Sequence, residues 1–372
     1  MAEKKEKERI LEPYGDVDLQ MMEDFCQAKG VSGQEKEASR VMKRYLEGYV
    51  DTIEYDNLGS IIGCKKGEGE GPKVAFFGHL DEVGFYVIKI EEEGYIRLSK
   101  AGGMWGHVLL AQEVMITTRE GKEIIGMISA PAPHGMPEEV AKRVKDLDEL
   151  FVDIGVCDKQ EAEALGIRKG DMVTPVAAFR VMSNPNYLMA KAWDDRIGGI
   201  IATDIVRHLK GEKLKADVYA VGSVQEEVGL RGAKTAAYAV SPDIGIALDV
   251  TLANDVPDSK FGEPLGSGVT LTIMDGSAIA NRELVYYMED LCKELGITYI
   301  HDIFLRGGTD SGEIHTTKNG IVNMTISIPA RSIHSHRGII HRKDYADTVK
   351  LLTEFARRVD WDLVYKFRAS NI

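Results

Sequence analysis

The stretch KVAFFGHLDEVG, residues 73–84, decides how this sequence folds. It begins with an apolar run over 73–77 that is typical of a short buried strand, and a His and a carboxylate follow where the run stops. Open α/β sheets place their ligand sites at such strand ends. His79 can bind a metal ion, and Asp81 can hold a His ring in the required orientation. The stretch therefore predicts a buried strand of an α/β sheet with a functional site at its end.

Most of the chain outside residues 85–184 alternates between strand and helix patterns. After residue 190, for example, Ile197, Ile201 and Ile205 recur on one face of an expected helix. Strands that alternate with helices predict an α/β fold with helices layered on a sheet. The predicted helices cover 19–29, 35–49, 197–209, 284–294 and 342–359, and the predicted strands cover 53–55, 60–64, 217–224, 244–249, 269–273 and 321–328.

Residues 85–184 have a different character, because short β-like runs dominate and Gly and Pro separate them. This pattern predicts a small β-rich domain. It interrupts the α/β domain, which we expect to comprise 17–84 and 185–372, with a charged tail over 1–16. Inside the β-rich domain the predicted strands are 114–118, 124–129, 152–156 and 172–174, with one helical piece at 137–145.

Composition narrows the class of protein. The 372 residues suffice for more than one domain, and a formal net charge of −13 argues against a general nucleic-acid binder. The four cysteines form no CxxC pair, which excludes a zinc ribbon or a redox motif of that type. No apolar run approaches the ~18–20 residues of a membrane span, and the charged first residues do not resemble a signal peptide. Together these features favour the cytoplasm.

Four further stretches look chemical, and each follows an expected strand or precedes an expected helix. With His79 they provide two His residues and several carboxylates, a mixture that suits zinc, cobalt or manganese. An alternative for Asp195, in the first stretch, is that it is simply a helix N-cap with no chemical role. The stretches are KAWDDR at 191–196, QEEVG at 225–229, LDVT at 248–251 and RSIHSH at 331–336.

The adjacent pair Glu226 and Glu227 is the most informative of these. Burying two neighbouring carboxylates is costly unless a cation lies close by. Neighbouring side chains point in different directions, so one can bind a metal while the other faces a substrate. A hydrolase with two metal ions holds them ~3.5–4 Å apart, and a carboxylate with two oxygens can bridge them. The alternative interpretation is an acidic surface turn.

Six motifs occur in the order found in a known family: GHLDEVG, AWDDRIGG, QEEVGLRGA, ALDVT, GGTDSGEIH and PARSIHSH. Over roughly residues 17–360 the chain resembles the M42 family of dinuclear metalloaminopeptidases. The resemblance implies a mixed-sheet, helix-layered catalytic domain like that of zinc peptidases, with an inserted β-barrel-like domain used for dimerisation and assembly. It also implies a homo-oligomer in which dimers build a tetrahedral dodecamer.

The resemblance also implies the metal ligands. His79 and Asp249 look like the terminal ligands of one metal, and Asp194 looks like the bridging carboxylate. Glu227 and His334 look like the ligands of the second metal. Two divalent ions per subunit are therefore expected, with zinc or cobalt ahead of manganese.

Other positions acquire roles in the same way. Glu226 looks like the general base, and Asp81 resembles the carboxylate that orients the neighbouring His ligand. Gly308, Thr309 and Asp310 resemble a loop that lines the substrate cleft. This chain departs from the family pattern in its charged tail, at His336 and over residues 337–339. The resemblance therefore does not fix which substrate side chain the enzyme prefers.

The expected reaction is the removal of one residue from the N-terminus of short peptides, with no nucleic acid or membrane as partner. A related dinuclear deacylase or carboxypeptidase would use nearly the same ligands. A glycosidase needs two carboxylates on either side of a sugar, and Glu226 and Glu227 could supply them. That interpretation would leave His79 and His334 unexplained. A non-catalytic scaffold is the remaining alternative. His315, close after the GGTDSG motif, could also approach the site.

Overall fold

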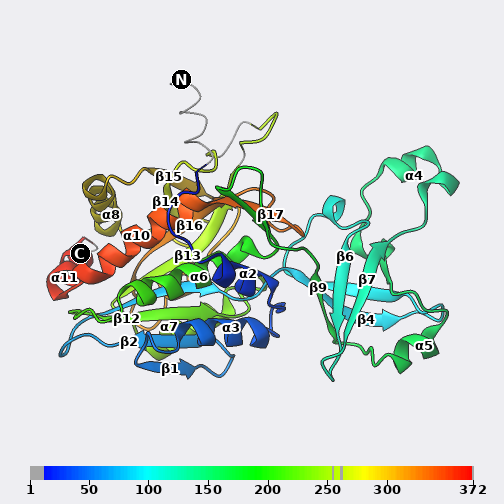
Figure 1. Ribbon diagram of the computed structural model, residues 1–372, viewed down its shortest axis with the longest axis horizontal. Helices are drawn as coiled ribbons and strands as arrows, with labels where there is room; N and C mark the ends of the chain where they lie inside the picture. The colour runs from blue at the N-terminus through cyan, green and yellow to red at the C-terminus, as the bar shows by residue number, and fades with distance from the viewer. Residues whose placement is uncertain (1–11, 254, 260–262, 371–372) are drawn as a thin grey trace.

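The computed structural model describes residues 12–253, 255–259 and 263–370, so most of the predicted charged tail lies outside the described residues. Two bodies lie side by side, a helix-layered sheet and a smaller barrel (Figure 1). The predicted fold class, a mixed α/β sheet with an inserted barrel-like element, is confirmed. The exact domain boundaries stay a prediction. Within the described residues, no helix combines the length and the apolar character needed to cross a membrane.

The large sheet has eight strands in the order β1-β2-β12-β3-β13-β16-β14-β15. Strands β3, β12, β13 and β16 run parallel, whereas β2 and β14 pair antiparallel with β12 and β16, so the sheet is mixed. The apolar run at 73–77 lies near the middle of the sheet and extends to His79. The strands are β1 (Thr52–Tyr55), β2 (Ile61–Lys65), β3 (Lys73–His79), β12 (Asp217–Ser223), β13 (Ile244–Leu252), β14 (Val269–Asp275), β15 (Tyr299–Phe304) and β16 (Val322–Ala330).

Helices cover both faces of this sheet (Figure 1). The main core lies under α2, α3, α6 and α10, where Ile197, Ile201 and Ile205 of α6 are buried, each contributing about 1.5–3 kcal/mol. A smaller core under α7 and α9 covers the other face. The helices are α2 (Leu19–Gln27), α3 (Lys36–Leu46), α6 (Trp193–His208), α7 (Arg231–Val240), α8 (Arg282–Leu295), α9 (Ser311–Ile314), α10 (Arg342–Arg358) and α11 (Trp361–Ala369).

The barrel is closed by six strands in the order β4-β5-β8-β7-β6-β9 and has an apolar core of its own. The sequence patterns did not predict β4 and β5, because buried and exposed residues do not alternate along them with the regular period of two. The strands are β4 (Gly84–Ile90), β5 (Ile96–Ala101), β6 (Glu113–Thr117), β7 (Glu123–Ser129), β8 (Phe151–Asp153) and β9 (Met172–Pro175); α4 (Glu138–Lys142) and α5 (Lys159–Ala164) lie on its outside.

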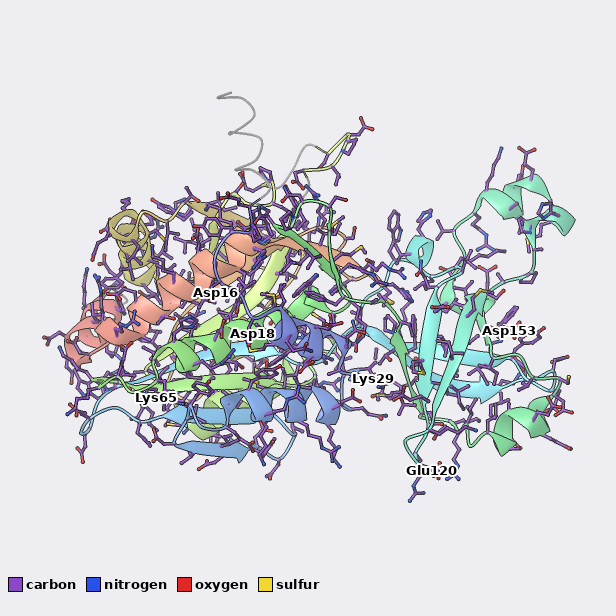
Figure 2. The ribbon with its side chains drawn as sticks, in the orientation of Figure 1. Asp16, Asp18, Lys29, Lys65, Glu120 and Asp153 are labelled. Atoms are coloured by element: carbon purple, nitrogen blue, oxygen red, sulfur yellow. The ribbon has the colours of Figure 1, made fainter. Side chains whose placement is uncertain are left out.

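Several contacts fix the barrel against the sheet domain. Lys29, which Figure 2 labels between the two bodies, lies 2.8 Å from Glu123 of β7 and 3.5 Å from Glu37 of α3. Arg337 donates a hydrogen bond of 3.2 Å to Gln112. A small three-stranded sheet joins segments on both sides of α6 in the sequence. It consists of β10 (Arg180–Val181) and β11 (Tyr187–Ala190), which come directly after the barrel strands in the chain, and β17 (Gly338–His341). These contacts hold the barrel beside the strand end that carries His79.

A buried group of charges lies behind the end of β3. The ammonium of Lys191 lies 2.6 and 2.7 Å from the two carboxylate oxygens of Glu82, and Arg196 approaches the same carboxylate to 3.5 Å. Arg196 also donates to the carbonyls of Phe25 and Ala28 at 2.6 and 2.9 Å. The group therefore ties the N-terminal segment to both motifs, GHLDEVG and AWDDR.

We expect Glu82→Met to lower the free energy of unfolding by about 3–5 kcal/mol, because two buried cations then lose their carboxylate. Urea unfolding of the metal-loaded protein measures this change. The double variant Glu82→Met/Lys191→Met is the control, and it should recover part of the loss because one unpaired charge is gone. A single variant as stable as the wild type would show that the buried pair contributes nothing.

Candidate active site

The predicted site residues come from five segments that meet at one edge of the sheet. Because β3, β12, β13 and β16 are parallel, their carboxyl ends lie together. A cavity of about 580 Å³ opens there. The start of α6 and the loop after β16 supply the remaining groups. All five predicted ligands and the predicted base line this cavity: His79, Asp194, Glu226, Glu227, Asp249 and His334.

Asp194 occupies the centre of the group. One of its oxygens lies 3.2 Å from Nε2 of His79, and the other lies 3.1 Å from Nε2 of His334. Two overlapping sets of donor atoms share this carboxylate, one with His79 and Asp249 and one with Glu227 and His334, and each set spans no more than 4.8 Å. The arrangement offers two adjacent cation sites with a common carboxylate.

The protonation equilibria of these groups are strongly perturbed. Burial, with the charge of Asp194 next, raises the pKa of Asp249 and of Glu227 to about 8. Burial also raises the pKa of Glu226 well above its usual range, and Asp249 adds to the effect. Among the described residues, no donor forms a hydrogen bond to the buried Oε1 atom of Glu227, although Nε2 of His334 lies 3.4 Å from it. Repelling carboxylates and an orphaned acceptor are the features that a bound divalent cation would satisfy, so the donor set fits such ions.

Without metal, the protein should therefore lose stability as the pH rises from about 6 to 9. Folded Asp249 and Glu227 titrate at about 8, far above the ordinary value near 4. Burial lowers the pKa of His334, but its ion pair with Asp194 outweighs this and raises the pKa to about 9. In all three cases the folded state holds a proton that the unfolded state has released, so stability present at low pH disappears as the pH passes the folded pKa.

The measurement is the melting temperature of chelator-treated protein between pH 6 and 9. Metal-loaded protein is the control, because bound ions keep the same ligands deprotonated and should remove most of the slope. A melting temperature that rises with pH in the chelated protein would contradict the prediction.

Asp81 is fully buried and holds more than one neighbour. Nδ1 of His79 lies 3.1 Å from the Asp81 carbonyl and 3.4 Å from its carboxylate. A carbonyl can only accept, so Nδ1 is the donor and Nε2 remains free to bind a metal when the ring is neutral. The Asp81 carboxylate also accepts the backbone N–H groups of Glu226 and Glu227 at 3.0 and 3.1 Å. The sequence predicted the contact with His79 and missed the two backbone contacts.

Asp195 has two partners. Its carboxylate accepts the N–H of Gly198 at 3.0 Å, three residues along the chain, which is the pattern of a helix N-cap. The other oxygen accepts the backbone N–H of His79 at 3.0 Å. Asp195 thus joins the start of α6 to the end of β3, a role that no local sequence signal indicates.

The predicted cleft loop divides into two parts. Gly308 and Thr309 line the cavity, whereas Asp310 does not and is buried behind it, where it accepts a hydrogen bond from Ser223. Gly307, which begins the same predicted loop, also lines the cavity. The sequence analysis assigned no role to the other lining residues, because most of them are apolar and carry no chemical signature. These are Leu230, Val250, Thr251, Leu252, Phe304, Arg306 and Ile333.

A turn of the barrel packs against two of the site residues. A Cβ atom on Gly102, whose φ is +84°, would lie 3.0 Å from Oε2 of Glu227. A Cβ atom on Gly103 would lie 3.3 Å from Nδ1 of His334. The turn after β5 therefore packs tightly against both residues, although the two glycines do not themselves line the cavity.

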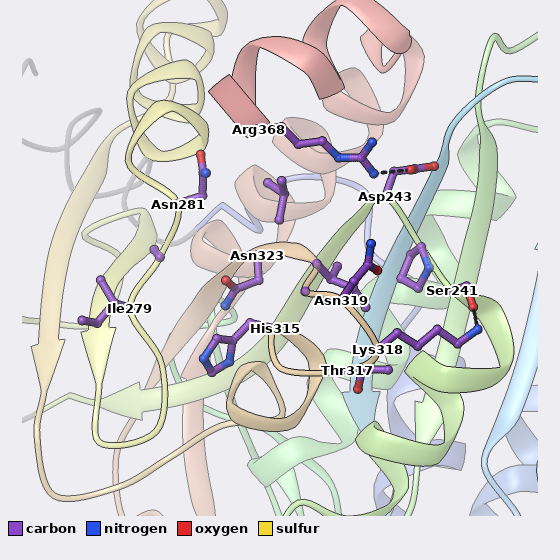
Figure 3. A pocket seen from close by; sticks show the side chains of 15 residues that line it. Ser241, Asp243, Ile279, Asn281, His315, Thr317, Lys318, Asn319, Asn323 and Arg368 are labelled. Carbon is purple, nitrogen blue, oxygen red and sulfur yellow. Dashed lines mark hydrogen bonds and ion pairs between the residues drawn. The ribbon is translucent and has the colours of Figure 1, made fainter. Parts of the chain in front are cut away.

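A second cavity of about 710 Å³ lies at the opposite end of β13 and β16, where these strands begin (Figure 3). Arg368 of α11 pairs with Asp243 on its rim at 2.6 Å. His315 lines this cavity and not the first one, so it takes no part in the candidate metal site. None of the predicted site residues is found here.

Comparisons with known proteins agree with this geometry. The sequence model of the family described as M42 glutamyl aminopeptidase matches residues 59–351. The putative aminopeptidase FrvX of Escherichia coli K12 is 33% identical over 94% of this chain and 98% of its own. The crystal structure of a TET aminopeptidase from a marine sediment Thaumarchaeota archaeon is 37% identical, covers 94% and 98% of the two chains and superposes with a TM-score of 0.91. A Pyrococcus horikoshii TET1 peptidase, described as able to assemble into a tetrahedron or a large octahedral shell, is 30% identical over 92% and 99%, with a TM-score of 0.82.

Proposed function

Because the chain belongs to the M42 family of aminopeptidases, and is therefore a peptidase, we propose that it removes N-terminal residues from peptides with the help of two divalent metal ions. The observation that carries the metal part is the carboxylate of Asp194, whose two oxygens face His79 and His334 at 3.2 and 3.1 Å. Glu227 also belongs to two of the His-containing sets, but the two oxygens of Asp194 each face a different His ring.

The first ion would be held by His79 and Asp249, the second by Glu227 and His334, with Asp194 common to both. When bound, such ions lower the pKa of water and polarise a carbonyl group. The buried Oε1 of Glu227 accepts no hydrogen bond from any residue that the structure describes, which supports a ligand role for this side chain. Zinc and cobalt suit the donor set, and manganese is acceptable.

Glu226 is proposed as the general base. It lines the cavity, and its carboxylate lies 3.7 Å from Nε2 of His79, beside but outside the two sets that contain Asp194. It would take the proton of the attacking water and deliver it to the amine of the departing peptide. Burial raises its pKa and thereby strengthens it as a base, while Asp81 holds its backbone N–H in place.

Part of the cavity wall is apolar and includes Leu252, Phe304 and Ile333. This part supports the proposal that the cavity accommodates a substrate side chain. The preferred residue is tested with a panel of aminoacyl anilides, after chelation and the return of zinc, cobalt or manganese one at a time. N-acetylated anilides are the matched control: an aminopeptidase leaves them intact, whereas the alternative deacylase or carboxypeptidase reaction does not depend on a free amine. No hydrolysis of any free-amine substrate with any metal would refute the proposal.

We also propose a homo-oligomer. The close structural relation to a TET1 peptidase described as forming tetrahedral or octahedral shells supports this. The barrel is the expected dimerisation element, and its outer surface exposes Trp105 and Ile125. Light scattering after size-exclusion chromatography should give a mass of several subunits, and a monomer at micromolar concentration would contradict the assembly. The cytoplasmic location stays a prediction.

A further inference from the structure

The backbone just before Glu226 and Glu227 adopts a conformation that its sequence disfavours. Gln225 has a φ of +57°, in the left-handed region that a residue with a side chain rarely adopts. Helix α7 begins only at Arg231, so the turn is not yet stabilised by a helix. Within the turn, Arg231 donates its N–H to the Gln225 carbonyl at 3.2 Å, and a second interaction comes from elsewhere in the chain.

That interaction comes from Glu35, which lies 190 positions earlier in the chain. Its Oε1 accepts the N–H of Gln225 at 2.9 Å and the N–H of Gly33 at 2.6 Å. Glu35 is only 5% exposed. It occupies the N-cap position of α3, yet its side chain makes no capping hydrogen bond to that helix. The carboxylate is thus directed away from its own helix and towards the turn of the active site.

Glu35 and Asp81 act on successive atoms of the same turn. Glu35 holds the N–H of Gln225, and Asp81 holds those of Glu226 and Glu227. Ser32, three residues before Glu35, donates to Asp81 at 2.6 Å and joins the two carboxylates into one framework. Three consecutive N–H groups are therefore fixed by two buried acids from two separate segments.

We infer that Glu35 is a positioning residue: by holding the N–H of Gln225, it sets the direction in which the side chains of Glu226 and Glu227 leave the backbone. The inference rests on the proposed function and extends it to a residue outside the cavity. The chemical requirement is a hydrogen-bond acceptor at position 35, not a charge. Burial, and then the charge of Asp81, raise the pKa of Glu35 to about 7, which agrees with a neutral acceptor being tolerated there.

The test compares Glu35→Met, which keeps the size and removes the acceptor, with Glu35→Gln, which keeps the acceptor and removes the charge. In the metal-loaded enzyme Glu35→Met should lower kcat roughly 10–100-fold with an unchanged KM, and Glu35→Gln should retain the wild-type kcat. If the Met variant does not fold, Glu35→Asp replaces it, because its shorter side chain withdraws the acceptor from Gln225 and should also lower kcat.

A second measurement does not depend on activity. Calorimetric titration of chelated protein with zinc should show that Glu35→Met weakens one of two binding events roughly 10–100-fold, whereas Glu35→Gln leaves both unchanged. If the wild type hydrolysed no anilide, the proposed function would fail, but the titration would still decide the role of Glu35.

Asp56 provides the matched control. Its carboxylate accepts three backbone N–H groups, from Leu58, Gly59 and Ser60, as well as the hydroxyl of Thr235, and it does not line the cavity. Asp56→Leu should lower the melting temperature without changing kcat or metal affinity. Wild-type kcat and metal affinity in Glu35→Met would overturn the inference, and so would equal losses in the Met and Gln variants.

Discussion

Glu226→Gln should reduce turnover by a factor on the order of 10²–10⁴ while both metal ions remain bound. The amide has nearly the shape of the carboxylate but cannot accept the proton of the attacking water. Its backbone N–H can still donate to Asp81, so the turn should keep its conformation. The measurements are kcat on the best anilide substrate and the metal content by elemental analysis after gel filtration.

The neighbouring residue supplies the control. Glu227→Gln makes the same carboxylate-to-amide change at the next residue along the chain. The Glu227 side chain faces Asp194 and His334. It should lower the occupancy of one ion, and added metal should partly restore its activity. Added metal should not restore Glu226→Gln. If the metal-replete Glu226→Gln enzyme turned over at the wild-type rate, Glu226 would not be the base.

Asp194→Ala should remove both ions and lower kcat by at least about 10³-fold, because the metals supply several kcal/mol of transition-state stabilisation. Its two oxygens face the two sets of donor atoms, so no other single substitution should affect both sites equally. Its removal also leaves His79 and His334 without their ion-pair partner.

Asp249→Ala is the comparison, because Asp249 belongs to only one of the two sets that contain Asp194. Elemental analysis should find close to no metal in Asp194→Ala and one ion per subunit in Asp249→Ala. Two ions bound to Asp194→Ala with wild-type affinity would show that this carboxylate is not shared. One ion in each variant would point to two independent sites.

The features that sequence reasoning could predict are those with a local signal. The apolar run before His79 and the carboxylate at the end of the predicted strand 244–249 each indicated a strand end, and the carboxyl ends of parallel strands meet at one edge. In the structure this strand, β13, continues past Asp249 to Leu252. The patterns alone indicated an α/β domain interrupted by a β-rich block, and the family resemblance implied the mixed sheet and the barrel-like insertion that the structure contains.

The features that it missed depend on contacts between distant segments. Glu35 reads as an ordinary acidic residue at the start of a helix, and only the folded chain places it against Gln225. Asp195 similarly gives the signal of an N-cap and no sign of its bond to His79. Strands β4 and β5 were missed because the barrel surface mixes charged and apolar residues without a regular period.

The turn of Gly102 and Gly103 shows that the sheet domain and the barrel are not independent modules, because a barrel turn packs against residues of the site. A hydrolase trimmed of its insertion would lose the wall against which Glu227 and His334 rest, even if the trimmed sheet folded well. The barrel is also the element proposed to bind other subunits. A barrel transplanted between relatives should therefore carry this turn with it, because the turn packs against two site residues whatever the outer face of the barrel binds.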